Sequence, residues 1–141
     1  MHVMTREEAS AFLAAGPRTG VLATVRADGR PHAVPVWYDL DGQEIVFTAW
    51  HTTAKVADIR RDGRVTLCVD DKAPPFSFVS VEGVATIADD MDELRRWATR
   101  IGGRYMGQDR AEAYGARNAV PGELVLRIRP TKVIGRADVA G

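Results

Sequence analysis

The residues whose types and spacing are best suited to binding a ligand lie at positions 48–55, in the run Thr-Ala-Trp-His-Thr-Thr-Ala-Lys. This run joins a β-branched, alternating stretch to apolar residues at helical spacing, which predicts the start of a helix. The first N–H groups of a helix lack intrahelical acceptors, and the helix dipole favours an anion there. Thr52 and Thr53 add hydroxyls, and Lys55 adds a positive charge one turn in. The spacing fits a phosphate site, or alternatively a helix that Thr52 merely caps beside a solvated lysine.

Other catalytic and metal-binding patterns are missing from the chain. The histidines, His2, His32 and His51, have neither the mutual spacing nor the cysteine partners of a metal site. Cys68 is the one cysteine, and its place within an alternating apolar run predicts a buried, inert thiol. The nucleophile motif GxSxG and the nucleotide motifs GxGxxG and GxxxxGK[ST] are absent. Motifs therefore nominate no catalytic side chain and no metal ligand.

Composition excludes several classes of protein. The chain has 141 residues, and its 19 Lys and Arg balance its 19 Asp and Glu, which argues against nonspecific binding of nucleic acid. No apolar run is long enough for a membrane helix, and the first 15 residues do not resemble a signal peptide, so we expect a cytoplasmic protein. Only three of the basic residues are lysines, which makes Lys55 stand out.

Hydrophobic periodicity predicts one domain that is mainly β with short helices. We expect helices at 6–15, 52–61, 90–101 and 110–116, and strands at 19–25, 32–38, 44–49, 64–70, 76–87 and 122–129, with further pairing at 131–136. The first three strands are expected to form a meander over turns at 27–30 and 39–42. Pro35 predicts an edge strand or a bulge, Gly83 a bend or a bulge, and Gly102-Gly103 the end of a helix.

Several strands carry apolar residues on both faces. In the strand at 44–49, for example, Ile45 and Phe47 lie on one face and Val46 lies on the other. A small barrel that stands alone has one wet face. The pattern therefore predicts an antiparallel β-barrel whose outside is covered by helices or by a second subunit.

A family resemblance follows from the order of several short motifs. The segments 19–25, 28–32 and 35–38 closely resemble the opening hairpin of the split β-barrel flavoproteins, the pyridoxamine 5′-phosphate oxidase-like superfamily. The likeness continues through 53–56, 59–65, 81–85, 105–107 and 129–133, and covers roughly residues 5–137. Within this superfamily the chain is most similar to the deazaflavin-dependent branch, which uses coenzyme F-420. The implied fold is a six- to seven-stranded antiparallel split β-barrel of the FMN-binding type.

The resemblance implies a homodimer with two cofactors at the dimer interface. The strand-to-helix segment would hold the cofactor phosphate, and the return strand would lie along the ring; the implied cofactor-binding residues are Thr48, Thr52, Thr53, Lys55, Val34, Pro35, Val36 and Trp37. Arg60 would reach the acidic tail of F-420. Many members carry an arginine at the position of Thr53, and threonine there disfavours tight binding of the FMN phosphate.

The implied function is that of an oxidoreductase in which F-420 passes a hydride to a conjugated small molecule. An FMN-dependent oxidoreductase and a carrier that binds a flavin or haem without turnover are the alternatives. Trp50 and His51 would shape the substrate pocket or donate a hydrogen bond there. The alternative is that Trp50 packs at a subunit contact and that His51 is a solvated side chain.

Overall fold

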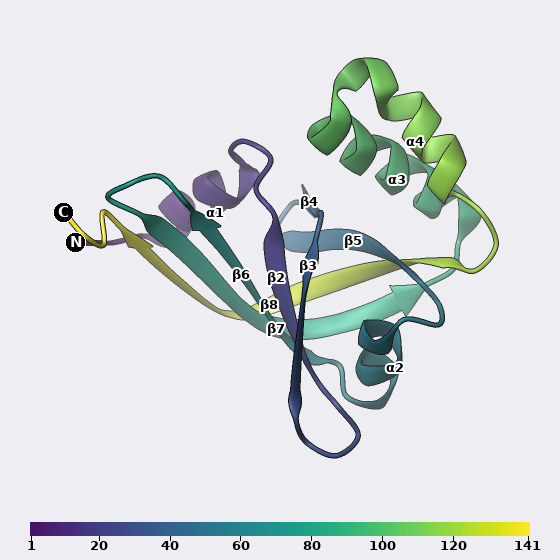
Figure 1. Cartoon of the computed structure of the whole chain (residues 1–141), viewed down its shortest axis with the longest axis horizontal. Coiled ribbons are helices and arrows are strands. Elements are labelled where there is room, and N and C mark those ends of the chain that lie inside the picture. Colours follow the sequence, from purple (N-terminus) through teal and green to yellow (C-terminus); the bar gives the residue numbers. More distant parts are fainter.

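The computed structural model describes all 141 residues as one antiparallel sheet with helices packed around it (Figure 1). The strands are β1 (His2–Val3), β2 (Gly20–Val25), β3 (Pro31–Val36), β4 (Asp39–Asp41), β5 (Glu44–Trp50), β6 (Arg64–Asp71), β7 (Ser77–Ala88) and β8 (Glu123–Ala137). The helices are α1 (Arg6–Ala14), α2 (Ala54–Arg61), α3 (Met91–Met106), the 3-10 turn η1 (Gln108–Arg110) and α4 (Ala111–Asn118). Both termini lie together, because β1 pairs with β8.

The strand order is β3-β2-β6-β7-β8-β5-β4, so β3 and β4 are the two edges of the sheet. Only Trp37 and Tyr38 separate these edges along the chain. The opposite ends of the sheet are therefore held close by two residues, although no ladder joins them. Such closure by a short link, with a gap between the edges, is the geometry of a split barrel.

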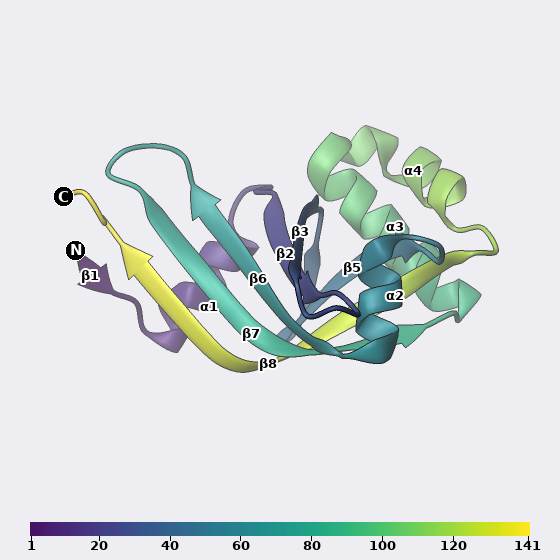
Figure 2. The ribbon, with the colours of Figure 1, turned by 60° about the horizontal axis from the view of Figure 1, so that its bottom comes forward.

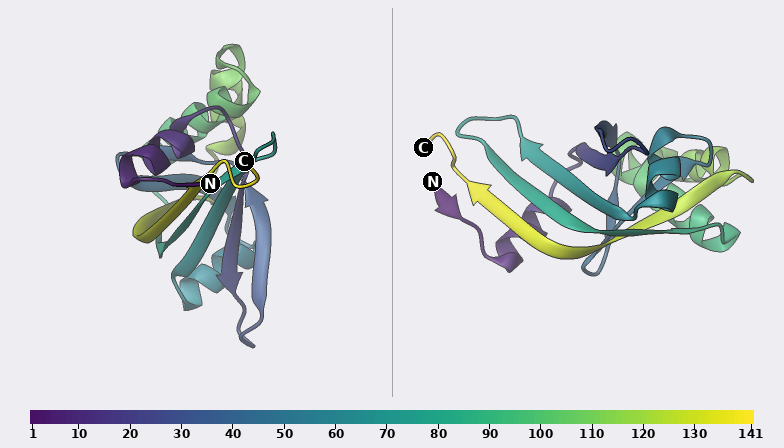
Figure 3. Two further views of the ribbon diagram at one scale, coloured as in Figure 1. Left: turned by 90° about the vertical axis from the view of Figure 1, so that its left-hand side faces the viewer. Right: turned by 90° about the horizontal axis from the view of Figure 1, so that it is seen from below.

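A single hydrophobic core fills the barrel. The inward side chains of β2, β5, β6, β7 and β8 meet in one cluster, which is possible only because the sheet curls around them (Figures 2 and 3). Fully buried members from different strands include Leu22, Phe47, Leu67, Val81 and Leu126. A second, smaller cluster lies outside the sheet, where Leu94 and Trp97 of α3 cover Val46 and Val125.

The long strands β7 and β8 bend together (Figure 3), and their register shifts between Glu82 and Gly83. A Cβ on Gly83 would lie 2.5 Å from the backbone oxygen of Arg129, so only glycine allows this close approach. The predicted bulge at Gly83 and the predicted edge position of Pro35 on β3 are both confirmed.

The predicted meander of the first three strands is wrong. β3 pairs only with β2, and β5 pairs with β4 and β8 on the far side of the sheet. Residues 39–41, predicted as part of a turn, form β4 and pair with β5 across the turn at Gly42. An alternating pattern indicates a strand and its two faces but not its partner, and β5 needs a covered position because both of its faces are buried.

The predicted end of a helix at Gly102-Gly103 is also wrong, because α3 continues to Met106. Both glycines lie against α4: a Cβ on Gly102 would be 2.4 Å from Cβ of Tyr114, and one on Gly103 would be 3.0 Å from Cβ of Ala111. They serve close packing of two helices rather than termination. The helix ends instead at Gly107, whose φ of 106° is in the region that favours glycine.

Two smaller expectations have different outcomes. Thr5 forms the capping box of α1 with Glu8. Cys68 is half-exposed on β6 rather than buried, and partial burial raises the pKa of its thiol. None of the helices combines the length and apolar character needed to cross a membrane.

The buried Tyr38 hydroxyl provides a test of the closure of the barrel. It donates to the backbone oxygen of Leu13 at 2.8 Å, and burial raises the pKa of Tyr38 to about 12. Tyr38→Phe should lower the free energy of unfolding by about 1 kcal/mol, because Arg104 still donates to the same oxygen. In the wild type, stability should fall as pH rises from about 10, the pKa in the unfolded chain, through about 12.

Chemical denaturation over a pH series measures both effects. Tyr114→Phe is the control, since the Tyr114 hydroxyl makes no hydrogen bond in the structure. Equal alkaline loss of stability in the wild type and in Tyr38→Phe would contradict the assignment.

Candidate cofactor-binding site

A cavity of about 480 Å³ opens between the edge strand β3, the end of β5, the start of α2 and the wall of α3. This volume falls within the range of about 300–1,000 Å³ that is usual for small-molecule sites. In Figure 1, α3 and α4 lie above this region and α2 below it. The lining residues are Thr19, Pro35, Val36, Trp37, Thr48, Lys55, Ala98, Ile101, Gly102 and Asn118.

Lys55 is the cation that lines this cavity. Its side chain is partly buried, which lowers the pKa of the ammonium group, while the nearby carboxylate of Glu123 opposes that shift. Burial likewise raises the pKa of Glu123, and Lys55 and Thr48 oppose that change. No ion pair within 4.0 Å joins the two charges, whereas the exposed Lys72 pairs with Asp70 at 3.6 Å. The Lys55 ammonium is therefore available to an anion in the cavity.

The start of α2 leaves backbone donors free. Thr53 is its N-cap residue, but its side chain makes no capping hydrogen bond. Instead the Thr53 hydroxyl and backbone N–H both donate to the backbone oxygen of Trp50, at 2.8 and 3.1 Å. The first N–H groups of the helix thus have no side-chain acceptor and can serve a ligand.

Trp37 forms part of the opposite wall, where β3 ends. Its ring stacks on Tyr105 of α3 with centroids 5.0 Å apart and planes at 1°, and Tyr114 of α4 lies 6.5 Å away. The Tyr105 hydroxyl donates to the Arg18 oxygen at 2.7 Å and accepts from the Tyr38 N–H at 3.2 Å. These contacts fix Trp37 between the edge strand and the helices.

Five of the predicted cofactor-binding residues line the cavity together: Thr48, Lys55, Pro35, Val36 and Trp37. Val34 does not line it and packs against the barrel core instead. Thr52 is exposed and is not the helix cap, because Thr53 occupies that position. A role of these residues in binding a cofactor stays a prediction.

The remaining predicted residues lie outside the lining. Trp50 is exposed, and its ring covers Gly122. The backbone N–H of His51 donates to the backbone oxygen of Gly122 at 2.8 Å, and the ring Nδ1 of His51 lies 3.1 Å from the same oxygen. This turn admits no Cβ at position 122, since one would lie 2.5 Å from the Trp50 ring. Arg60 is exposed near the end of α2. Trp50 and His51 thus hold the turn before β8, and their substrate role stays untested.

Sequence reasoning missed the α3 wall and the acid beside Lys55. Ala98, Ile101 and Gly102 reach the cavity because α3 packs over β5 and β8. Glu123 lies there because β8 pairs with β5, which sets it opposite Trp50. These residues are far from Lys55 along the chain, and no local signal marks them; only the strand pairing could have found Glu123.

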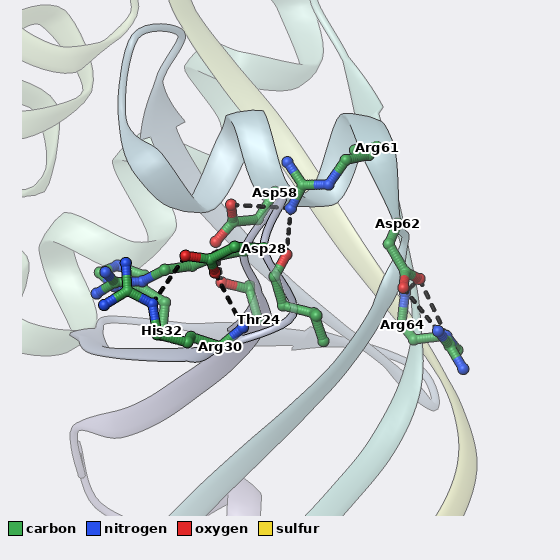
Figure 4. Close-up of polar contacts among 10 residues, drawn as sticks. Thr24, Asp28, Arg30, His32, Asp58, Arg61, Asp62 and Arg64 are labelled. Atoms are coloured by element: carbon green, nitrogen blue, oxygen red, sulfur yellow. Dashed lines mark hydrogen bonds and ion pairs between the residues drawn. The ribbon is translucent and has the colours of Figure 1, made fainter.

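A buried carboxylate anchors the helix that carries Lys55. Asp58 lies one turn after Lys55, and its side chain is only 7% exposed. It accepts from the Thr24 hydroxyl of β2 at 2.7 Å and from Arg61 at 3.3 Å (Figure 4). Arg61 also donates to the backbone oxygen of Val25. Burial alone would raise the pKa of Asp58, but these hydrogen bonds lower it below its usual value.

Thr24→Val tests this anchor. The change leaves a buried carboxylate with one donor fewer, so we expect the free energy of unfolding to fall by about 1.5–3 kcal/mol. Thr24→Ser keeps the hydroxyl and is the matched control. Urea denaturation measures both variants, and a loss in Thr24→Ser as large as that in Thr24→Val would contradict the role of the hydroxyl, because serine keeps it.

Comparison with known proteins agrees with this architecture. A family model described as pyridoxamine 5′-phosphate oxidase matches residues 5–137. The chain belongs to this family, and the predicted split β-barrel fold is confirmed.

The similar proteins include two reductases that use F-420. A biliverdin reductase of Mycobacterium tuberculosis that depends on reduced F-420 is 27% identical over 135 residues, which cover 94% of this chain and 89% of that protein. The crystal structure of a conserved hypothetical protein from Mycobacterium tuberculosis superposes with a TM-score of 0.85 and 28% identity, covering 96% of this chain and 86% of the other. An F-420 reductase gives a TM-score of 0.70 and 27% identity over 86% and 93% of the two chains.

Proposed function

We propose that the protein is an oxidoreductase that uses coenzyme F-420 to reduce a conjugated small molecule. The observation that carries the proposal is the cavity that joins Lys55 and the uncapped start of α2 to the edge strand β3. The distant similarity to an F-420-dependent biliverdin reductase supports the choice of cofactor.

The residues present fit the two ends of such a cofactor. Lys55 and the free N–H groups of α2 would hold the phosphate, because an ammonium and oriented donors together favour an anion, and the Thr48 hydroxyl, which also acts on Glu123, would lie beside them. Thr53 is unsuited to this role through its hydroxyl, which already donates to Trp50. The phosphate site therefore depends more on Lys55 than a site with an additional arginine would.

The ring would lie along β3 and the link that follows it. β3 pairs only with β2, so the backbone groups along its other side have no strand partner. The backbone groups of Trp37, in the link after β3, can bond the polar edge of the ring, and Trp37 is held rigidly by Tyr105. Pro35 contributes shape but no N–H donor.

F-420, when bound in its reduced form, would supply hydride chemistry to the site. The protein would bind and orient cofactor and acceptor, and N–H donors at the polar edge of the ring would stabilise the negative charge that develops there. This division of labour is consistent with a cavity that has one lysine and no evident acid–base pair on its walls.

The active form is proposed to be a homodimer. Val21 pairs with Pro35 on one side and Cys68 on the other, so the three side chains form a row on the outer face of the sheet. Ala23 pairs with Ala33 in the next row and with Thr66 on its other side, so the part of this face formed by β3 and β2 is apolar, with Val21 45% exposed. Because Pro35 belongs both to this row and to the cavity, a second copy on this face would cover the cofactor.

Fluorescence titration with F-420 and with FMN tests the cofactor. We expect F-420 to bind, and Lys55→Ala to weaken its binding by about 1–3 kcal/mol through loss of a charge-assisted hydrogen bond. Lys72→Ala is the matched control, since Lys72 is exposed and far from the cavity lining.

The other outcomes of this titration separate the alternatives. Tight stoichiometric FMN binding with no affinity for F-420 would replace the proposal by an FMN-dependent oxidoreductase. Binding of F-420 without reduction of any acceptor, with quinones, enones and tetrapyrroles in the panel, would favour a carrier.

Analytical ultracentrifugation tests the dimer. Val21→Asp places a charge in the centre of the proposed interface, so we expect it to produce monomers and to weaken cofactor binding. Val139→Asp is the control, since Val139 is similarly exposed but lies near the C-terminus. A monomeric wild type at high concentration would refute the proposed assembly.

A further inference from the structure

We propose that Glu123 makes the anion position beside Lys55 selective for a singly charged phosphate diester over a doubly charged phosphate monoester. This inference deepens the proposed function and rests on its placement of an anion at Lys55. It assigns a role in specificity to a residue outside the cavity lining.

The position of Glu123 follows from the pairing of β5 with β8. Trp50 is opposite Glu123 and Thr48 is opposite Val125, so Thr48 and Glu123 are diagonal neighbours on one face of the ladder. That face continues the side on which Val125 packs under α3. Glu123 therefore faces the same region as Thr48, which lines the cavity together with Lys55 of α2.

The environment of Glu123 keeps it there. Its backbone N–H donates to the Val120 oxygen at 3.1 Å, and the adjoining turn is held by the bonds of His51 to Gly122. Its side chain is half-buried, and the charged group that acts on it is Lys55 of α2. The carboxylate forms no ion pair with Lys55 within 4.0 Å, so the ammonium group of Lys55 can still contact an anionic ligand.

The charge balance at this position sets the preference. Lys55 and Glu123 together sum to zero, and no arginine lines the cavity to add a second positive charge. A ligand with one negative charge gains from direct contact with Lys55 while Glu123 lies farther away. A second negative charge is attracted by Lys55 and repelled by Glu123, so the neutral pair returns little energy for it, whereas removing a doubly charged phosphate from water costs more than removing a singly charged one.

A preference for a singly charged phosphate would distinguish the two candidate cofactors, F-420 and FMN. FMN ends in a phosphate monoester, whose charge is about −1.5 to −2 near neutral pH. F-420 carries its phosphate as a diester within the side chain, with a single negative charge. The Lys55–Glu123 pair thus matches the diester and disfavours the monoester, independently of the ring.

A matched pair of flavins isolates the effect of phosphate charge. FMN and the methyl ester of its phosphate share one ring and differ in the charge of one group. We expect the wild type to bind the methyl ester about tenfold more tightly, and Glu123→Gln to improve FMN binding about tenfold while changing that of the ester far less. Fluorescence quenching at fixed pH and ionic strength gives the dissociation constants.

Glu7→Gln removes an exposed carboxylate of α1 and serves as the control for total charge. Equal or tighter binding of FMN than of its ester by the wild type would overturn the proposal, and this result needs no variant. Unchanged discrimination in a folded Glu123→Gln protein would also overturn it, as would binding of neither flavin at millimolar concentration. Failure of F-420 to bind would instead refute the proposed function and leave the flavin comparison to stand.

Discussion

The two-residue link between β3 and β4 is the constraint on which the rest of the structure depends. It carries the chain from one edge of the sheet to the other, and its side chains point into different environments. Tyr38 enters the core and bonds α1 through Leu13, whereas Trp37 stacks on Tyr105 of α3. Closure of the barrel and construction of one cavity wall are therefore consequences of the same two residues.

The opposite wall is determined by the placement of α2. The Thr24–Asp58–Arg61 contacts hold this short helix on β2, and Lys55 projects from its first turn. A helix of eight residues has little stability of its own, so its position depends on such tertiary contacts. The anion position in the proposed function thus requires a buried polar network that never touches the ligand.

Local patterns predicted the elements better than their arrangement. The capping box at Thr5, the bulge at Gly83 and the edge position of Pro35 follow from short-range chemistry, and the structure agrees. The meander and the helix end at Gly102 were wrong, because each depends on a partner remote in sequence. Two adjacent glycines predict the end of a helix, yet here both glycines allow α4 to pack closely against α3.

By itself the sequence determined which segments are strands or helices, the family, and the presence of a lone lysine at a helix start. Tertiary structure alone decided that Lys55, Thr48 and the end of β3 face one cavity, that α3 closes it, and that Glu123 stands beside the lysine. The physical reason is that side-chain periodicity specifies the faces of an element. The partner of each face is chosen by packing between residues that are distant along the chain.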